Sequence, residues 1–215
     1  MRIFDCILLD DELDLLELRF RELADLPVTH VIAEAETDHQ GAPKPLHFQD
    51  SRYGRFRPWY GRWTHVVIRP GELPDKPPKE RKDALREYLA HGLSGSEGDL
   101  ILHGSITEIP RAQVVEYLTR APLEHPVTLQ MQVHAYRPGL VHPLPWRGTA
   151  ACAYGSIPGS GLTFLREQRH RWPAITRAGT RLAHWGEPER EFYPDGKKLR
   201  QLPPGGWPRV LRETA

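Results

Sequence analysis

Acidic and hydroxyl side chains follow the apolar runs of the sequence, where they could bind a polar ligand. They are Asp10 and Asp11 after residues 3–9, Glu34 near the end of 28–35, and Ser105 after 99–103. If these runs are parallel strands, their carboxyl ends meet at one edge of a sheet, which is where open α/β sheets bind ligands. We therefore expect the four side chains to lie close together.

Basic side chains at the start of a predicted helix indicate an anionic ligand. Arg81 and Lys82 lie in the first turn of the helix expected at 80–91, where a cation opposes the helix dipole unless an anion lies beside it. The 11 histidines contain no HExxH motif, and Cys6 and Cys152 form no CxxC motif. These spacings predict no zinc site, and we interpret the two cysteines as core residues.

The segment RYGRFRPWYGRW (52–63) combines four arginines with five aromatic residues. Arginines pair with phosphates and aromatic rings stack on bases, so one interpretation is a surface for a polyanion. Sugar rings also stack on Trp and Tyr. The alternative is therefore a carbohydrate-binding surface made by Trp59, Tyr60 and Trp63, with Trp146 from later in the chain.

Strands and helices alternate through the first 120 residues. Apolar runs predict strands at 3–9, 28–35, 64–68 and 99–103, and helical spacing predicts helices at 12–23, 80–91 and 111–119. This alternation is typical of an α/β fold with a mostly parallel sheet flanked by helices. Later, TLQMQVHAYRP and TAACAYGSI are expected to be extended and suit antiparallel pairing, and a basic helix is expected at 162–171.

The composition is that of a folded protein of balanced charge. The chain has 215 residues, enough for one substantial core, and a net charge of +1, which gives no reason to expect nucleic-acid or anionic-membrane binding. Asp5 and the acidic residues 10–12 interrupt the apolar N-terminus, and no run approaches the roughly 18 apolar residues of a membrane helix. We expect a single domain, residues 1–215, in the cytoplasm.

Four segments resemble glycosyltransferase family 17, in the family's order. IFDCILLDDELDLLELRFREL (3–23) is similar to the family's opening FDCFLFNNELDLLEIRLNEL, and VIAEAETDHQGAPKPLHF (31–48) ends like the family loop GKPKPLHF. GDLILHGSITEIPR (98–111) is similar to DDIIIISDVDEIPR, and AGTRLAHWGEPE (178–189) resembles AGWHLSYFGGPE.

The resemblance implies a GT-A-type glycosyltransferase fold with a mostly parallel, Rossmann-like central sheet. It implies that residues 1–120 bind a nucleotide-diphosphate sugar and that residues 121–215 hold the acceptor site and a tail. Family members invert the configuration of the transferred sugar, and they include the N-acetylglucosaminyltransferase that adds the bisecting sugar to N-glycans. Donor contacts are then expected from Asp10, Asp11, Glu12, Glu34, Lys44, Lys82, Ser105, Thr107 and Arg181, and acceptor contacts from Trp59, Tyr60, Trp63 and Trp146.

Two departures from the family pattern concern the metal. Ser105 and Thr107 stand where the family has an aspartate pair that binds a divalent cation, and hydroxyls are poor ligands for such a cation beside carboxylates. Arg181 stands where the pattern has histidine, and a guanidinium can bind phosphate oxygens bidentately. We therefore expect catalysis without a metal or other cofactor, with Arg181 and other basic side chains balancing the leaving diphosphate.

The candidates for the catalytic base are Glu108, His184 and Glu187, of which Glu108 is the acid retained from the family's DVDEIP. Several acids also have structural interpretations. These are capping of the following helix for Glu108, a buried salt bridge to Arg19 for Glu34, and a first-turn helix position for Glu12.

The leading hypothesis is an inverting glycosyltransferase, of hexosyl or N-acetylhexosaminyl type. It would move a sugar from a nucleotide-diphosphate sugar to a hydroxyl of a soluble small-molecule or glycan acceptor, with no membrane partner. The first alternative is a catalytically degenerate protein of the same fold that only binds a nucleotide or glycan, because the aspartate pair is missing. The second is a nucleic-acid-modifying glycosyltransferase, which rests on residues 52–63 alone.

Overall fold

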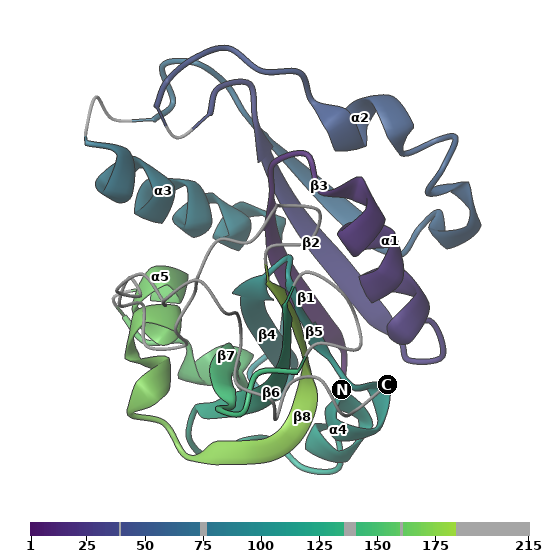
Figure 1. Ribbon diagram of the computed structural model, residues 1–215, viewed down its shortest axis with the longest axis vertical. Coiled ribbons are helices and arrows are strands. Elements are labelled where there is room, and N and C mark those ends of the chain that lie inside the picture. The colour runs from purple at the N-terminus through teal and green to yellow at the C-terminus, as the bar shows by residue number, and fades with distance from the viewer. Residues whose placement is uncertain (39, 74–76, 136–140, 160, 184–215) are drawn as a thin grey trace, which may run out of the picture.

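The computed structural model describes residues 1–38, 40–73, 77–135, 141–159 and 161–183. Within these ranges eight strands form one sheet in the order β3-β2-β1-β4-β7-β6-β8-β5, with helices on both faces (Figure 1). The strands are β1 (Ile3–Leu9), β2 (Val28–Ala35), β3 (Trp63–Ile68), β4 (Leu100–Ser105), β5 (Glu108–Pro110), β6 (Val127–Ala135), β7 (Trp146–Ala153) and β8 (Ala174–Ala183). The helices are α1 (Leu13–Glu22), α2 (His47–Ser51), α3 (Pro78–Glu87), α4 (Ala112–Leu118) and α5 (Gly161–Glu167).

The half of the sheet formed by β3, β2, β1 and β4 is parallel throughout. The four apolar runs predicted as strands form these strands, and the predicted helices at 12–23, 80–91 and 111–119 correspond to α1, to α3 with a following 3-10 turn, and to α4. Because the strands are parallel, the residues that follow β1 and β4 emerge at the same edge of the sheet.

The two faces of the sheet carry separate apolar layers, because side chains alternate along each strand. On β1, Phe4 and Cys6 face Leu85 of α3 and Leu165 of α5. The alternate residues of β1 pack against α1 and α2 in one cluster and against α4 in another. Both cysteines are buried and free. No helix within the described ranges is long and apolar enough to cross a membrane.

The other half of the sheet is mixed, so the predicted parallel arrangement holds throughout only in the half formed by β3, β2, β1 and β4. β7 runs antiparallel to both β4 and β6, β8 runs parallel to β6, and β5 runs antiparallel to β8. Three of the seven strand pairings are thus antiparallel. The sequence indicated the extended segments β6 and β7 but not the short strand β5 or the long strand β8.

A buried ion pair, which we call the core cluster, links β1, α1 and β2. Arg19 binds the Asp5 carboxylate through two nitrogens, at 2.5 and 2.7 Å, and His30 Nδ1 lies 2.9 Å from the same carboxylate. All three side chains are buried. The predicted alternative of a salt bridge between Arg19 and Glu34 is therefore wrong, because Arg19 pairs with the acid on the neighbouring strand.

Candidate active site

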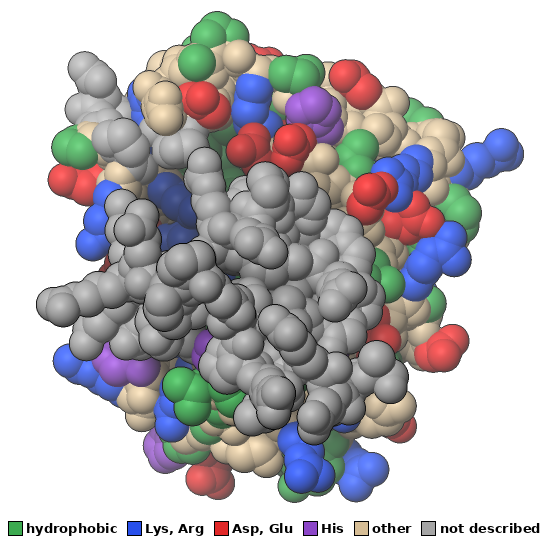
Figure 2. Space-filling model, viewed as in Figure 1, with side chains coloured by type: hydrophobic (Ala, Val, Ile, Leu, Met, Phe, Trp, Pro, Cys, Tyr) green, Lys and Arg blue, Asp and Glu red, His purple; other side chains and the backbone are tan. Residues whose placement is uncertain are grey.

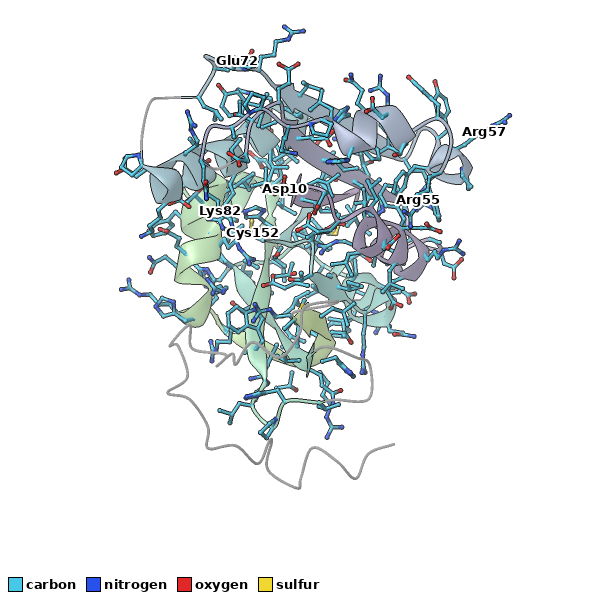
Figure 3. All side chains as sticks on the ribbon, turned by 45° about the horizontal axis from the view of Figure 1, so that its top comes forward. Asp10, Arg55, Arg57, Glu72, Lys82 and Cys152 are labelled. Carbon is cyan, nitrogen blue, oxygen red and sulfur yellow. The ribbon has the colours of Figure 1, made fainter. Side chains whose placement is uncertain are left out.

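A cleft of about 320 Å³ opens at the carboxyl ends of β1 and β4. Its charged and polar lining comes from several elements that are distant in sequence. Asp10 after β1 and Lys82 of α3 lie at this edge of the sheet (Figure 3). Among the described residues the cleft is lined by five cationic side chains, Lys44, Lys82, Arg86, Arg166 and Arg181, and by four acidic ones, Asp10, Glu12, Asp38 and Glu108.

The loop after β1 is held in place by contacts of its own. Lys44 Nζ lies 3.0 Å from Asp10 Oδ1 and donates to the Asp10 carbonyl oxygen at 3.1 Å. Glu12 Oε2 accepts a hydrogen bond from the backbone N–H of Asp10 at 3.1 Å. Lys44 is largely buried, so its charge is held at the wall of the cleft rather than free in solvent.

Glu108 is the centre of a second buried group, which we call the cleft cluster and which also contains Trp146, Arg166 and Arg181. Both guanidinium nitrogens Nη1 and Nη2 of Arg166 donate to the Glu108 carboxylate, each at 2.9 Å. The indole N–H of Trp146 donates to Oε1 at 2.8 Å, and the backbone N–H of Ser105 donates to Oε2 at 3.1 Å. The carboxylate therefore accepts four hydrogen bonds.

These contacts disfavour Glu108 as a general base. Burial would raise its pKa, but the Arg166 charge and the hydrogen bonds outweigh burial and lower the pKa of Glu108 to about 2. A general base works best with a pKa near the operating pH and needs a lone pair aimed at the substrate. The geometry instead makes Glu108 a residue that positions Arg166 and Trp146.

Arg181 reaches the cleft from β8, where it pairs with Glu108 across the ladder of β5 and β8. Its guanidinium carbon lies 3.7 Å from the centre of the Trp146 ring, a cation–π contact. Burial lowers the pKa of Arg181 to about 10, with Glu108 acting in the opposite direction. Arg181 is therefore still charged at neutral pH.

Helix α3 supplies two further cations. Lys82 is exposed at the cleft, and its pKa is lowered by partial burial and then by the charges of Arg86 and Arg166. Arg86 pairs with Asp83 on its own helix at 2.5 Å. An anion placed between these side chains would relieve their mutual repulsion.

His103 is a cleft residue that the sequence analysis missed. It lies on β4, is 1% exposed, and has Nδ1 3.3 Å from the backbone oxygen of Cys6 on β1. Nε2 is buried and has no hydrogen-bond partner among the described residues. Burial and then the Arg166 charge lower the pKa of His103 to about 3, so the imidazole is neutral. The only signal in the sequence was a histidine that follows three apolar residues of a predicted strand.

Some predicted donor residues do not line the cleft. Asp11 is exposed to solvent, and Thr107 is not part of the lining. The Glu34 carboxylate is buried and accepts hydrogen bonds from the backbone N–H groups of Phe48 and Gln49, in the first turn of α2. It also lies 3.2 Å from His65 Nε2. Glu34 thus caps a helix, and the predicted meeting of the four strand-end side chains holds only for Asp10 and Ser105.

Of the predicted acceptor aromatics, only Trp146 lines the cleft. Trp59 packs against Phe20 of α1, and Trp63 packs against Phe48 of α2. Tyr60 is exposed beside Trp63, with ring centres 6.2 Å apart. These three residues therefore lie in the layer formed by α1 and α2, away from the cleft lining.

Most arginines of the 52–63 segment contact the protein itself. Arg55 pairs with Asp14 and Glu17 at 2.6 Å each, and Arg62 donates to backbone carbonyl oxygens that precede β2. Arg57 is exposed at the edge of the molecule (Figure 3). Acidic and basic side chains are interspersed over the face shown in Figure 2. Arginines that are paired within the protein offer little charge to a polyanion.

The residues at the end of β4 do not fit a divalent cation. Thr107 Oγ1 donates to Ser105 Oγ at 3.2 Å, so the pair offers two hydroxyls already bonded to each other. Within the described ranges no three His, Cys, Asp or Glu side chains gather where they could hold a metal ion. Two predicted base candidates, His184 and Glu187, lie outside the described residues.

Comparison with known families gives a match over most of the chain. The model of the family described as glycosyltransferase family 17 matches residues 1–154, which is well over half of the chain. The matched span runs from β1 past the end of β7, so it contains Glu108 and Trp146 but not Arg166 or Arg181. No curated protein matches the chain.

Proposed function

The chain belongs to glycosyltransferase family 17, and from that premise we propose that it is an inverting glycosyltransferase with a GT-A-type arrangement of its parallel strands. Its donor would be a nucleotide-diphosphate sugar bound in the cleft. The observation that carries this proposal is the convergence of five cationic side chains, which outnumber the four acidic ones, at the carboxyl ends of β1 and β4. Open α/β sheets bind ligands at this edge, and a diphosphate is the anion that such a group of cations suits.

The cations would serve the leaving group. When the bond between the anomeric carbon and the diphosphate breaks, negative charge develops on the departing oxygen and must be balanced. Arg166 is neutralised by Glu108 and Lys44 by Asp10, so these two pairs mainly shape the cleft. We assign the balancing charge chiefly to Lys82 and Arg181.

We propose that this chemistry needs no divalent metal. Support comes from the donor set at the end of β4, where Ser105 and Thr107 offer two hydroxyls and no carboxylate. Arg181 on β8 also supports metal independence. Carboxylates placed in this part of the cleft would form ion pairs with Arg181 and would be poor ligands for a metal. No step of the mechanism is therefore assigned to an ion.

Inversion requires a base that removes a proton from the acceptor hydroxyl while that oxygen attacks the anomeric carbon from the face opposite the diphosphate. Glu108 is not assigned this role, because its carboxylate is held by four donors. His184 and Glu187 stay as proposed bases. Trp146, at the wall of the cleft, stays a proposed contact for a soluble small-molecule or glycan acceptor, through its edge rather than by stacking, because Arg181 lies over its ring.

The test is binding and turnover of a panel of nucleoside diphosphates and their sugar conjugates. We would use UDP, GDP and ADP, each alone and as its glucose and N-acetylglucosamine ester, with EDTA or with added Mn²⁺. Isothermal titration measures binding, and release of the nucleoside diphosphate measures transfer or hydrolysis. We expect a member of the panel to bind and to turn over equally in both media. Strict dependence on Mn²⁺ would overturn the metal-free proposal, and no binding at all would overturn the donor site.

A binding protein that lacks catalysis is the second candidate, and the engagement of Glu108 favours it, because the acid retained from the family motif is not available as a base. The same panel separates the two. Tight binding of a nucleotide sugar, with no release of the nucleoside diphosphate over hours in the presence of varied sugar acceptors, would favour the binding protein.

A further inference from the structure

His103 has two ring nitrogens in different surroundings. Nδ1 lies 3.3 Å from the Cys6 carbonyl oxygen, which can only accept, so the proton of the neutral ring belongs on Nδ1. Nε2 is then an acceptor, and it is buried without a partner among the described residues. Buried polar atoms in proteins are almost always hydrogen-bonded, so this nitrogen calls for a donor that the described protein does not provide.

The surroundings of His103 determine which kind of donor suits it. His103 lines the cleft, and burial, with the charges of Arg166 and Arg86, holds its pKa far below the usual value. A neutral acceptor among cations cannot bind a phosphate oxygen, which is itself an acceptor. It can bind a hydroxyl group. A nucleotide sugar carries hydroxyls on both sides of its diphosphate, on the ribose and on the transferred sugar.

We infer that Nε2 of His103 accepts a hydrogen bond from a hydroxyl group of the ligand that fills the cleft, and that His103 thereby contributes to donor specificity. This inference rests on the proposed function, since it takes the ligand to be a nucleotide sugar. The cations bind the diphosphate, and His103 accepts a hydrogen bond from a neighbouring hydroxyl of the same ligand. The energetic cost of burying Nε2 without a partner in the free protein is removed when the ligand hydroxyl donates to it.

The experiment compares His103→Phe, which keeps a ring but removes both nitrogens, with His103→Gln, whose amide oxygen can replace Nε2 as an acceptor. The probes are the nucleoside diphosphate and the nucleotide sugar that the wild-type protein binds best. We expect His103→Phe to weaken binding of the nucleotide sugar about tenfold, the scale of one hydrogen bond, about 1.4 kcal/mol. His103→Gln should retain most of the affinity.

The two probes distinguish the source of the hydroxyl. If His103→Phe weakens only the nucleotide sugar, the hydroxyl belongs to the transferred sugar. If it weakens both probes equally, the hydroxyl belongs to the ribose. The same variant should melt close to the wild-type temperature, because removal of the unpartnered nitrogen offsets the loss of the Nδ1 contact with Cys6. A merely structural histidine would instead lose stability.

The control is His91→Phe, the same substitution at an exposed histidine outside the cleft lining, which should change neither property. Wild-type affinity for both probes in His103→Phe would overturn the inference while leaving the proposed function intact. If His103→Phe does not fold, His103→Leu serves in its place. Failure of the wild type to bind any member of the panel would overturn the proposed function and this inference with it.

Discussion

The core cluster and the cleft cluster are built from the same chemistry, a buried carboxylate clasped by an arginine. Asp5 and Glu108 are each fully buried and each held by a guanidinium through two nitrogens. In both, burial would raise the pKa of the carboxyl group, and the arginine reverses the shift to well below the usual range. They differ in their surroundings: Arg19 is enclosed by protein, whereas Arg166 lines the cleft.

The two clusters are joined through the backbone. Arg19 Nη1 also donates to the carbonyl oxygens of Ser105 and Glu108. The core cluster therefore holds the turn between β4 and β5, and this turn presents the Glu108 side chain to Arg166. The Asp5–Arg19 pair, which does not line the cleft, thus helps to position the Glu108–Arg166 pair, which does. Mutations in the two clusters should therefore have different effects.

The largest effect is expected from Arg19→Met. It leaves the Asp5 carboxylate buried without its guanidinium, which costs about 3–5 kcal/mol in similar pairs. The control is Arg21→Met on the same helix, which breaks an exposed pair with Glu17 and should cost less than about 1 kcal/mol. Urea denaturation measures both. Equal losses in the two variants would mean that the core cluster does not support the fold as we describe.

Arg181→Ala should damage function rather than folding. The loss of one preorganised charged donor costs at least about 2 kcal/mol in transition-state stabilisation, seen as a lower kcat/KM for sugar transfer or nucleotide-sugar hydrolysis. Stability should fall by only about 1 kcal/mol, for the contact with Trp146. Arg120→Ala on the protein surface is the control. If Arg181→Ala loses as much stability as Arg19→Met, the cleft cluster supports the fold as much as the core cluster does, and our assignment of different roles to them is wrong.

Lys44→Glu tests whether the wall of the cleft faces phosphate. Charge reversal should weaken binding of a nucleoside diphosphate about tenfold and binding of the bare nucleoside much less, because only the former carries the charge. Lys79→Glu changes an exposed lysine of α3 outside the cleft lining and should affect neither. Equal weakening of both ligands would exclude Lys44 from phosphate binding.

The smallest effect concerns pH and His103. Its pKa is about 3 in the folded protein and near 6.5 when unfolded, so between these values the unfolded chain binds more protons and stability falls as the pH falls. From about pH 7 to about pH 6 the cost is about 0.7 kcal/mol. His103→Phe should lack this part of the loss, which parallel denaturation curves would show. An unchanged pH dependence would mean that His103 takes up protons equally in the folded and the unfolded protein.

Glu108 acts in the same direction at lower pH. Its folded pKa is about 2, below the usual value near 4.3, so its stabilising pairing is complete above the unfolded pKa and is lost as the pH falls toward 2. It should therefore produce no change in activity between about pH 6 and pH 8.

The strands and helices of the parallel half could be predicted from the sequence because each has a local sequence pattern. Residues 3–9 are apolar except for Asp5, and residues 28–35 are mostly apolar, and a strand buried on both faces needs such a run whatever its neighbours are. β5 and β8 have no such signature. β5 is three residues long and ends in proline, and β8 contains two arginines and a glycine. Their strand character comes from pairing with segments far away in the chain.

The residues of the candidate site were also predicted only in part from the sequence. Sequence reasoning placed Asp10, Lys44, Ser105 and Arg181 in one site, and all four line the cleft. It also placed Glu34 there, but the direction of a side chain at a strand end depends on what packs beside it, and α2 takes that carboxylate as its cap. Arg166 and His103 carried no motif, since burial beside Glu108 and Cys6 is what gives them their properties.

The amino-acid sequence was sufficient for the family and for the parallel half of the sheet, because these depend on which residues follow one another. The pairing of each acid with its arginine required the folded chain. Asp5 and Arg19 are close in sequence, but Glu108 and Arg166 are 58 residues apart. The energy of an ion pair depends on the distance between the charges and on their burial. Only the tertiary structure determines these two quantities.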